Sequence, residues 1–270
     1  MTARTTLTLT DNQYVKGALK ISWERFLFIV KEINVTKIKA VLFDLDGTLL
    51  PMDQDVFVGD YFKRLAAHFV QYGYDPQILI KNVWKGTMNV IKNDGQKTNE
   101  KAFWEFFVQT YGEKVLDDIV HFDEFYRDEF DKVQAVCGYT PKAEALISKL
   151  KEKVTLILAT NPIFPAVATH KRIRWAGLDV NDFSLVTTYE NISYCKPNPQ
   201  YYIDILNRFA LKPEECIMVG NDVGDDMVAK DLGMEVFLLT DCLINKSETD
   251  ITQYPNGSFD DLERFLLTKI

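Results

Sequence analysis

Short apolar runs alternate along this chain with stretches in which apolar residues recur at helical spacing. The runs lie at residues 40–43, 154–159, 183–187, 216–220 and 235–239. Continuous apolar runs of this length, bounded by turn residues, are typical of strands that are buried on both faces. Between and after them, helical spacing predicts helices at residues 140–151, 164–175, 200–209 and 258–268. This alternation predicts an α/β fold with a parallel, doubly wound sheet.

The alternation is interrupted by residues 53–135, which carry helical spacing almost throughout. Helices are predicted there at residues 55–72, 76–91, 98–111 and 117–133. These helices are rich in aromatic residues, which we expect mainly in a shared core. Lys81, Trp84 and Lys85 lie on one of them, where a solvated basic face is favoured over contact with a substrate.

The composition is that of a globular protein, since 47% of the 270 residues are hydrophobic and 26% are charged. A formal net charge of −8 argues against nucleic acid or an anionic membrane as a partner, because both attract an excess of Lys and Arg. No apolar run approaches the roughly 20 residues of a membrane span. We therefore expect a cytoplasmic protein, in which any anionic substrate needs a locally positive site.

The cysteines and histidines give little support to a metal site or a nucleophilic triad. The four cysteines are widely spaced and form no Cys-x-x-Cys pair, and the three histidines are scattered. Zinc, a disulfide framework and a Ser-His-Asp site are therefore not expected.

Asp44 and Asp46 follow the first apolar run directly and precede Gly47 and Thr48. In an extended backbone, side chains two residues apart point to the same side, so both carboxylates are expected over one small volume. Such a pair favours a bound cation or a shared proton. Asp44 is then a candidate nucleophile for phosphorus, Asp46 a candidate acid, and Thr48 a candidate ligand of phosphate oxygens. The alternative is an acidic turn without chemistry.

Polar residues also follow two of the later runs. Thr160 and Asn161 come directly after the second run, and a hydroxyl and an amide there can bind phosphate oxygens. Asn221 and Asp222 come after the fourth run. A carboxylate in that place suits Mg²⁺, which needs only one or two carboxylates besides waters and substrate. All these residues are predicted at the carboxyl ends of strands, where open α/β sheets bind ligands.

The string Asp44-Leu45-Asp46-Gly47-Thr48 resembles the first motif of the haloacid dehalogenase-like (HAD) superfamily of phosphohydrolases. Thr160 resembles the strand-terminal Ser or Thr of the second motif. Lys196, in Lys196-Pro197-Asn198-Pro199, resembles the lysine of the third motif. The resemblance covers essentially residues 38–240.

The resemblance implies three parts in the chain. A Rossmann-like core domain would comprise residues 40–52 and 136–270, with a helical cap domain inserted at residues 53–135. The cap would close over the active site and select the substrate. Residues 1–39 would be an N-terminal extension of unknown role, for which a packing appendage or an upstream start is favoured over a partner-binding arm.

The resemblance also implies roles for the site residues. Asp44 would attack phosphorus to give an aspartyl-phosphate, and Asp46 would act as acid and then as base. Lys196 would neutralise the phosphate and the aspartates. Mg²⁺ would be held by Asp44, Asp222 and the backbone carbonyl of Asp46.

The fourth motif matches less well, because Asn221 stands where an acidic residue is commonest. In one alignment Asp222 binds the metal directly and Asn221 binds it through water. In the other, Asp226 supports the metal or orients Lys196. Asp222 is favoured as the direct ligand, with Asp226 next, and Asp225 is expected to be a solvated residue that opens the following helix.

The expected protein is a Mg²⁺-dependent phosphomonoester hydrolase for a small phosphorylated metabolite, acting as a monomer or homodimer. The presence of Asp46 favours a phosphatase over a dehalogenase or an ion-pumping ATPase. A sugar phosphomutase of the same superfamily is the alternative enzyme, and a non-catalytic phosphate-binding module is the alternative from another class. A phosphonatase would need a cap lysine as Schiff base, and nothing singles out Lys81 or Lys85 for that task.

Overall fold

The computed structural model describes residues 37–270, of which Ile38–Ile270 form one unit. The extension predicted at residues 1–39 therefore lies almost wholly outside the described residues. In this described part, no helix is both long enough and apolar enough to cross a membrane.

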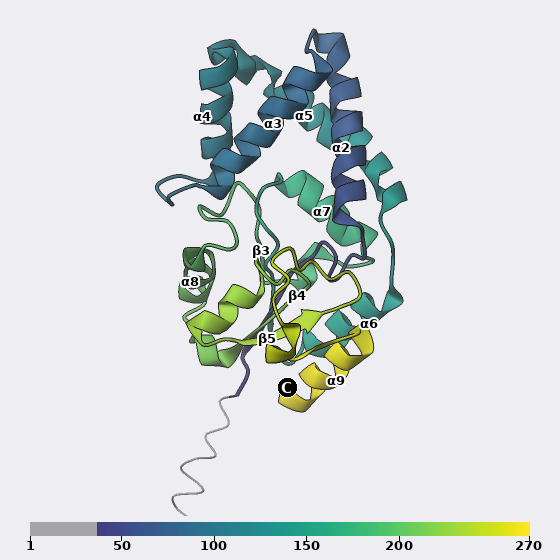
Figure 1. The fold of residues 1–270 in the computed structure, drawn as a ribbon, viewed down its shortest axis with the longest axis vertical. Helices are drawn as coiled ribbons and strands as arrows, with labels where there is room; N and C mark the ends of the chain where they lie inside the picture. Colours follow the sequence, from purple (N-terminus) through teal and green to yellow (C-terminus); the bar gives the residue numbers. More distant parts are fainter. Residues whose placement is uncertain (1–36) are drawn as a thin grey trace, which may run out of the picture. The chain divides into compact units, whose positions relative to one another are not determined.

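Within residues 37–270, six parallel strands form one sheet in the order β3-β2-β1-β4-β5-β6 (Figure 1). They are β1 (Ala40–Phe43), β2 (Thr155–Leu158), β3 (Leu185–Val186), β4 (Cys216–Gly220), β5 (Glu235–Leu239) and β6 (Asn256–Gly257). The strand order reverses next to β1, which confirms the predicted doubly wound fold. Phe43 pairs with Leu158 and with Val219, so the carboxyl ends of β1, β2 and β4 lie at one level.

The central strand β1 is buried on both faces, which explains its unbroken apolar sequence. Val41 and Phe43 belong to one hydrophobic cluster, while Ala40 and Leu42 belong to a second one. Side chains alternate between the two faces of a strand, so the two clusters are the two layers that cover the sheet. The first layer draws on helices α6 (Pro141–Leu150), α7 (Ala166–Trp175) and α9 (Phe259–Lys269), and the second on α8 (Pro199–Arg208) and the 3₁₀ helix η7 (Met227–Leu232).

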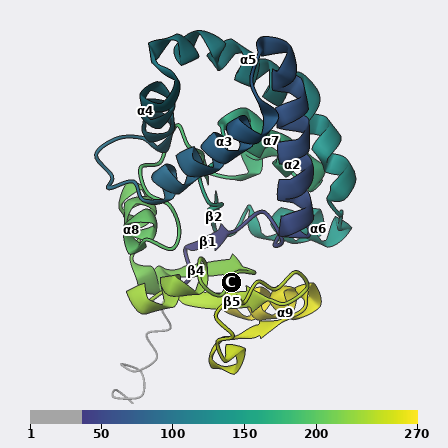
Figure 2. The same cartoon turned by 45° about the horizontal axis from the view of Figure 1, so that its top comes forward.

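A helical segment separates β1 from α6. It contains α2 (Gln54–Phe69), α3 (Pro76–Ile91), α4 (Asn99–Tyr111) and α5 (Ile119–Glu124). Figures 1 and 2 show these helices gathered at one end, apart from β4 and β5. Side-chain caps define their starts: Asp53 accepts hydrogen bonds from two N–H groups of α2, and Thr98 accepts one from α4. The predicted helices are thus present, whereas their status as a separate cap domain stays a prediction.

The helix predicted at residues 117–133 is broken into pieces. After α5 come a π-helical turn, η3 (Phe125–Glu129), and a 3₁₀ helix, η4 (Phe130–Val136). Phe125 and Phe130 are both fully buried, and their ring centroids lie 6.3 Å apart. Five residues of an α-helix turn through about 500°, which would point the two rings to different sides. The wider π turn brings both rings into the same core.

The remaining elements are short. They are the 3₁₀ helices η1 (Val70–Tyr72), η2 (Glu113–Asp118), η5 (Val180–Asp182), η6 (Pro213–Glu215) and η8 (Ile251–Gln253). The polar stretch at residues 240–257 also supplies β6, and its Ile244 forms an isolated bridge with Asp222. Strand β6 consists of Asn256 and Gly257, neither of which has an apolar side chain, so the hydrophobic pattern does not predict it.

Candidate active site

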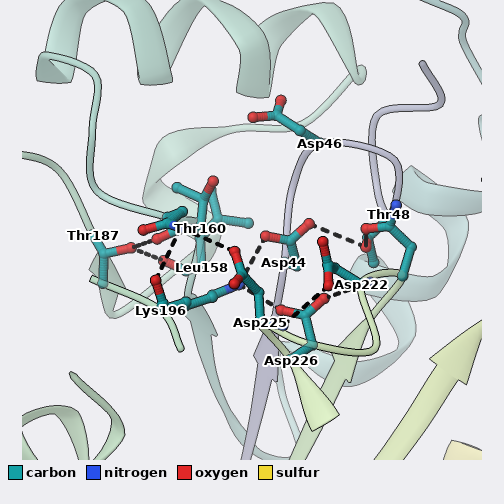
Figure 3. Close-up of polar contacts among 12 residues, drawn as sticks. Asp44, Asp46, Thr48, Leu158, Thr160, Thr187, Lys196, Asp222, Asp225 and Asp226 are labelled. Carbon is teal, nitrogen blue, oxygen red and sulfur yellow. Dashed lines mark hydrogen bonds and ion pairs between the residues drawn. The ribbon is translucent and has the colours of Figure 1, made fainter. Parts of the chain in front are cut away.

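Polar residues from separate segments meet at the carboxyl edge of the sheet (Figure 3). Asp44 directly follows β1, Thr160 lies two residues beyond the end of β2, and Asp222 lies two residues beyond the end of β4. Because these three strands end at one level, their loops face one another. The structure therefore brings Asp44 together with residues that lie more than 100 positions further along the sequence.

Lys196 lies between two carboxylates at this edge. Its Nζ donates a hydrogen bond to Oδ1 of Asp44 at 2.9 Å and another to Oδ1 of Asp226 at 2.7 Å. The Lys196 side chain is only 1% exposed. It precedes α8, which begins with the side-chain cap of Asn198 and with Pro199. Two roles were predicted for Asp226: support of the metal and orientation of Lys196. The hydrogen bond from Lys196 agrees with the second role.

The charges of this buried triad act on the pKa of Lys196 and on that of Asp226. Burial lowers the pKa of Lys196, but Asp226 and Asp44 outweigh this effect and place the pKa well above its usual value. Burial raises the pKa of Asp226, while the ammonium of Lys196 opposes the rise. Lys196 is therefore a fixed positive charge at neutral pH, next to the carboxylate of Asp44.

Thr48 stands behind Asp44. Its hydroxyl lies 3.2 Å from Oδ2 of Asp44 and 3.1 Å from Oδ1 of Asn221, and its backbone N–H donates to the carbonyl of Leu45. Both polar groups of Thr48 thus have partners within the protein. Thr48 supports the orientation of Asp44 here, and its contact with phosphate stays a prediction.

Asn221 ties the turn after β1 to a distant loop. Its Oδ1 faces Thr48, while its Nδ2 donates to the carbonyl of Cys242 at 2.6 Å. Gly47 has a φ of +82°, and a Cβ on it would lie 2.2 Å from Nδ2 of Asn221. A side chain at position 47 would therefore be strained and would displace Asn221. Binding of a metal through water by Asn221 stays a prediction.

Asp222 closes a tight turn with one of its oxygens. Oδ1 accepts hydrogen bonds from the backbone N–H groups of Gly224 at 2.7 Å and Asp225 at 3.0 Å, and Oδ2 lies outside these contacts. The expectation that Asp225 is solvated is wrong: it is half-buried and accepts a hydrogen bond from Nδ2 of Asn161 at 3.0 Å. Burial raises the pKa of Asp225, and Lys196 opposes the rise. Asp225 is half-buried because the turn directs its side chain toward the loop after β2, before η7 begins.

The donor atoms fit Mg²⁺, although within residues 37–270 no three Asp, Glu, His or Cys side chains form a ready-made metal site. Mg²⁺ takes oxygen ligands and keeps several waters, so two carboxylates suffice. Asp44 and Asp222 supply carboxylates from adjacent strands. Asp226 has both oxygens engaged, one by Lys196 and the other by the backbone N–H of Asp222 at 3.0 Å. Asp226 is also only 1% exposed, whereas Asp222 is half-buried and its Oδ2 lies outside the contacts of its turn, so Asp222 is favoured over Asp226 as a direct ligand.

The loop after β2 is held in place by α8. The backbone carbonyl of Thr160 accepts hydrogen bonds from the hydroxyls of Thr187 at 2.7 Å and Tyr201 at 2.9 Å. The next residue of α8, Tyr202, donates to the carbonyl of Asp225 at 2.7 Å. The Thr160 hydroxyl takes part in none of these contacts, and Thr160 lines the cavity described below.

Asn161 lies beside Thr160. Its Nδ2 donates to Asp225 and lies 3.4 Å from the carbonyl of Lys196, whereas its Oδ1 is buried without a hydrogen-bond partner in the described part of the chain. A phosphate oxygen accepts hydrogen bonds, so the Nδ2 group would have to serve it. The phosphate contact predicted for Asn161 therefore competes with Asp225.

Asp46 is turned away from the cluster and pairs with Arg172 of α7. Nη1 of Arg172 donates to Oδ2 of Asp46, and Nη2 lies 3.2 Å from the hydroxyl of Thr169. The Arg172 guanidinium is buried, with its Cζ 4.5 Å from the ring centroid of Phe164. Burial raises the pKa of Asp46. The Arg172 guanidinium opposes this rise, and the Asp44 carboxylate adds a smaller increase.

The expectation that Asp44 and Asp46 share one small volume is therefore wrong in this conformation. Figure 3 shows the Asp46 carboxylate apart from those of Asp44 and Asp226. The physical reason is that β1 ends at Phe43, so Asp46 lies in a turn where side chains no longer alternate. Arg172 itself was not predicted. Its signal in the sequence is helical spacing, because Ala168, Arg172 and Trp175 share one face of α7 and all are buried.

One cavity connects these residues with the helical segment. Its volume is about 1250 Å³, with the space open to solvent included. Of the predicted site residues, all but Thr48 line it: Asp44, Asp46, Thr160, Asn161, Lys196, Asn221, Asp222 and Asp226. Helices α2, α3, α4 and α5 provide the opposite wall, in which Trp84 takes part, while Lys81 and Lys85 are exposed outside it.

The sequence and fold can be compared with those of known proteins. The sequence profile of the haloacid dehalogenase-like hydrolases matches residues 38–233. A phosphoglycolate phosphatase of Pectobacterium atrosepticum is 24% identical over 201 residues, which cover 74% of this chain and 79% of that protein. The pyrophosphatase PpaX of Bacillus velezensis is 23% identical over 197 residues, which cover 73% and 81%.

A solved structure shows the same fold. It is that of the HAD-hydrolase YfnB from Bacillus subtilis bound to magnesium, with a TM-score of 0.51 and 18% identity. The match covers 86% of this chain and 99% of that one. The profile match spans well over half of the chain, and it confirms the prediction of a hydrolase. The chain belongs to the haloacid dehalogenase-like hydrolase family.

Proposed function

We propose that the protein is a Mg²⁺-dependent phosphatase that hydrolyses a phosphomonoester through an aspartyl-phosphate. The observation that carries the proposal is the buried Lys196, which is held between Asp44 and Asp226 at the carboxyl edge of the sheet. Attack of a carboxylate on a dianionic phosphate requires a fixed cation next to the nucleophile. The phosphatase and pyrophosphatase names of two relatives support the same class of reaction.

Asp44 is the proposed nucleophile. Lys196 donates a hydrogen bond to Oδ1 of Asp44, and the Thr48 hydroxyl lies near Oδ2. These contacts hold the Asp44 carboxylate at the carboxyl end of β1. The Lys196 ammonium offsets the repulsion between this carboxylate and the phosphate. The Thr160 hydroxyl, at the cavity wall, is placed to donate to a phosphate oxygen. Attack forms the bond from Asp44 to phosphorus and breaks the bond to the leaving oxygen.

Asp46 is the proposed acid and base. Burial raises its pKa, which favours the protonated form that gives a proton to the leaving oxygen. The resulting carboxylate then takes a proton from a water molecule, which hydrolyses the aspartyl-phosphate and regenerates Asp44. For both steps the Asp46 side chain must leave Arg172 and turn toward the substrate.

The same proposal assigns Mg²⁺ to the site. When bound, Mg²⁺ would supply positive charge against the phosphate oxygens. Asp44, Asp222 and the backbone carbonyl of Asp46 would hold it, and Asp226 would act through Lys196. In Asp222 one oxygen keeps the turn closed, which leaves Oδ2 for the metal.

The proposal includes the division into a core at residues 40–52 and 136–270 and a cap at residues 53–135. In this view α2, α3, α4 and α5 select the substrate, which is supported by their place in the cavity wall opposite Asp44. The partner would be a small phosphorylated metabolite, and the protein would act in the cytoplasm as a monomer or homodimer.

Hydrolysis of p-nitrophenyl phosphate with Mg²⁺ and with EDTA tests the proposal. Release of phosphate only in the presence of the metal would support it. The absence of turnover with every divalent metal would favour a phosphate-binding module without catalysis. Conversion of a hexose 1-phosphate into an isomer, with a bisphosphate activator present, would instead favour the phosphomutase.

A further inference from the structure

We propose that the cavity accepts phosphomonoesters whose alcohol part is bulky, apolar or aromatic and carries no second anionic group. This inference rests on the proposed phosphatase function, because it names the substrate class of the same site. The relatives described above are named for phosphoglycolate and pyrophosphate, which both carry a second anionic group. The cavity of this chain is built for a different kind of molecule.

The wall opposite Asp44 is mainly aromatic. The aromatic residues that line the cavity are Phe57, Tyr61, Phe62, Trp84, Phe103, Trp104, Phe122, Tyr126, Phe164 and Tyr189. They come from α2, α3, α4, α5 and η3 and from the loops after β2 and β3, so they surround the space above the carboxylates. Such a wall gains by covering an apolar or aromatic group, whereas it offers few partners to a small polar one.

Among the aromatic residues of this wall, Trp84 is the most exposed in the described part of the chain. Its residue surface is 51% exposed, and its ring meets Phe62 edge to face with 6.1 Å between centroids. An exposed indole at the lip of an aromatic cavity is a surface on which a second ring can stack. Trp104 of α4 lines the same cavity and packs edge to face on Phe122, with 5.3 Å between the ring centroids.

Within residues 37–270, the wall offers no positive charge for a second anionic group. Among the described residues that line the cavity, Lys196 is the only Lys, Arg or His. Lys196 is already shared by Asp44 and Asp226, and its role is to receive the phosphate. Arg172, which lies behind the wall, is paired with Asp46. A carboxylate or a second phosphate on the substrate would therefore lose its hydration without gaining a cation.

Negative charge is instead placed on the side of the helical segment. Asp123 of α5 lines the cavity. Glu100 donates its backbone N–H to the carbonyl of the lining residue Tyr189 at 2.8 Å, and Glu190 follows Tyr189 in the chain. Burial raises the pKa of Glu100, and the carboxylates of Glu190 and Asp123 add to the rise. A second anion on the substrate would meet the Asp123 carboxylate in the wall, and repulsion would disfavour its binding.

A matched pair of phosphonates tests the inference without any turnover. Benzylphosphonate and phosphonoacetate share the link from phosphorus to a methylene group, and they differ in a phenyl ring against a carboxylate. Calorimetric titration of the full chain with Mg²⁺ should give a dissociation constant for benzylphosphonate at least about tenfold below that for ethylphosphonate. Phosphonoacetate should bind more weakly than ethylphosphonate. Binding of phosphonoacetate as tight as that of benzylphosphonate would overturn the inference.

Two substitutions locate the effect. Trp84→Ala should weaken benzylphosphonate severalfold and leave ethylphosphonate unchanged, while Tyr139→Ala, an exposed aromatic outside the cavity, should change neither. Asp123→Asn should strengthen phosphonoacetate severalfold, while Asp117→Asn on η2, also outside the cavity, should not. Equal effects of each variant and its control would overturn the assignment of these side chains.

Turnover separates this inference from the proposed function. Benzyl phosphate and phosphoglycolate both release a primary alkoxide, so kcat/KM compares recognition more than leaving-group quality. The inference expects benzyl phosphate to be the better substrate. Hydrolysis that favours phosphoglycolate would overturn the substrate class and leave the phosphatase intact. If neither these esters nor p-nitrophenyl phosphate were hydrolysed, the phosphatase would fall, and the phosphonate titrations would still decide the ligand class.

Discussion

Arg172 donates a hydrogen bond from Nη1 to Oδ2 of Asp46, across 126 positions of sequence. Both groups are nearly buried, yet Oδ1 of Asp46 and Nε of Arg172 have no partner within the described residues. A bidentate pair would satisfy these atoms, so the observed single contact holds Asp46 less firmly. The pair therefore suits a resting position that the Asp46 carboxylate can leave when a substrate enters.

Replacement of Arg172 by Met should destabilise the protein in a pH-dependent manner. Without its cation the Asp46 carboxylate is buried unpaired, which costs about 3 kcal/mol of unfolding free energy near neutral pH. The pKa of Asp46, already raised by burial, rises further because the opposing effect of Arg172 is lost. In the variant the folded state then binds the proton more tightly than the unfolded state, so stability falls as pH rises above about 4. Urea unfolding from pH 4 to pH 8 measures this slope.

Two controls distinguish the ion pair from a general packing defect. Arg174→Met, an exposed position on the same helix, should lower stability little at any pH. Combining Arg172→Met with Asp46→Asn should recover much of the loss at pH 8, because the unpaired charge is gone. A deficit of Arg172→Met that stays constant from pH 4 to pH 8 would contradict the charge argument.

Asp44→Asn should lower kcat for p-nitrophenyl phosphate by about 10³-fold or more, because an amide is a far poorer nucleophile than a carboxylate. The substitution keeps the shape of the side chain and a possible contact with Lys196. Circular dichroism should therefore show a folded protein. Asp60→Asn, which removes a carboxylate paired with Arg64 on α2, is the matched control and should keep full activity. Substantial residual activity in Asp44→Asn would remove Asp44 from the role of nucleophile.

Asp46→Asn should impair substrates according to their leaving groups. A primary alkoxide needs the proton from Asp46, so kcat/KM for an alkyl phosphate should fall by about 10²-fold to 10⁴-fold. Nitrophenolate leaves without protonation, and the same parameter for p-nitrophenyl phosphate should fall much less. Steady-state kinetics with both esters tests this difference. A uniform loss for the two esters would argue against Asp46 as the acid.

Mg²⁺ should stabilise the protein through Asp222. Binding to the folded state at a hundredfold excess over the dissociation constant contributes about 2.7 kcal/mol, which appears as a rise of several degrees in Tm. Asp222→Asn should lose most of this rise, although an amide oxygen can still accept the hydrogen bonds from Gly224 and Asp225. EDTA should return the wild type to its metal-free Tm. An unchanged Mg²⁺ response in Asp222→Asn, with Asp231→Asn as control, would exclude Asp222 as a ligand.

The sequence predicts the core of the fold because buried parallel strands leave an unmistakable mark. The range Ala40–Phe43 agrees with the observed β1 in both bounds, as do those of β4 and β5. These strands are covered on both faces, so apart from Glu235 at the start of β5 their positions carry no charged or polar side chain. In contrast, β6 contains only Asn256 and Gly257, whose backbone pairing needs no apolar side chain. Such an edge strand is decided by tertiary contacts.

The site follows from the sequence only where a motif fixes a residue. Asp44 and Lys196 both lie in short sequence motifs that can be recognised, and in the structure Nζ of Lys196 lies 2.9 Å from Oδ1 of Asp44. The partner of Asp46 comes from a helix without any motif, and a buried arginine resembles a surface arginine until packing is known. Likewise the contact of Asp225 with Asn161 joins two loops whose approach no local pattern records.

Helix α8 carries two tyrosines in succession with different tasks. Tyr201 donates to the carbonyl of Thr160 in the loop after β2, and Tyr202 donates to that of Asp225 in the loop after β4. Lys196 enters the site from the residues just before the same helix. Helix α8 thus contacts both the loop proposed to bind phosphate and the loop proposed to bind metal, and it sets the spacing between them. Loss of either hydroxyl would therefore remove the hydrogen bond that joins one of these loops to the helix.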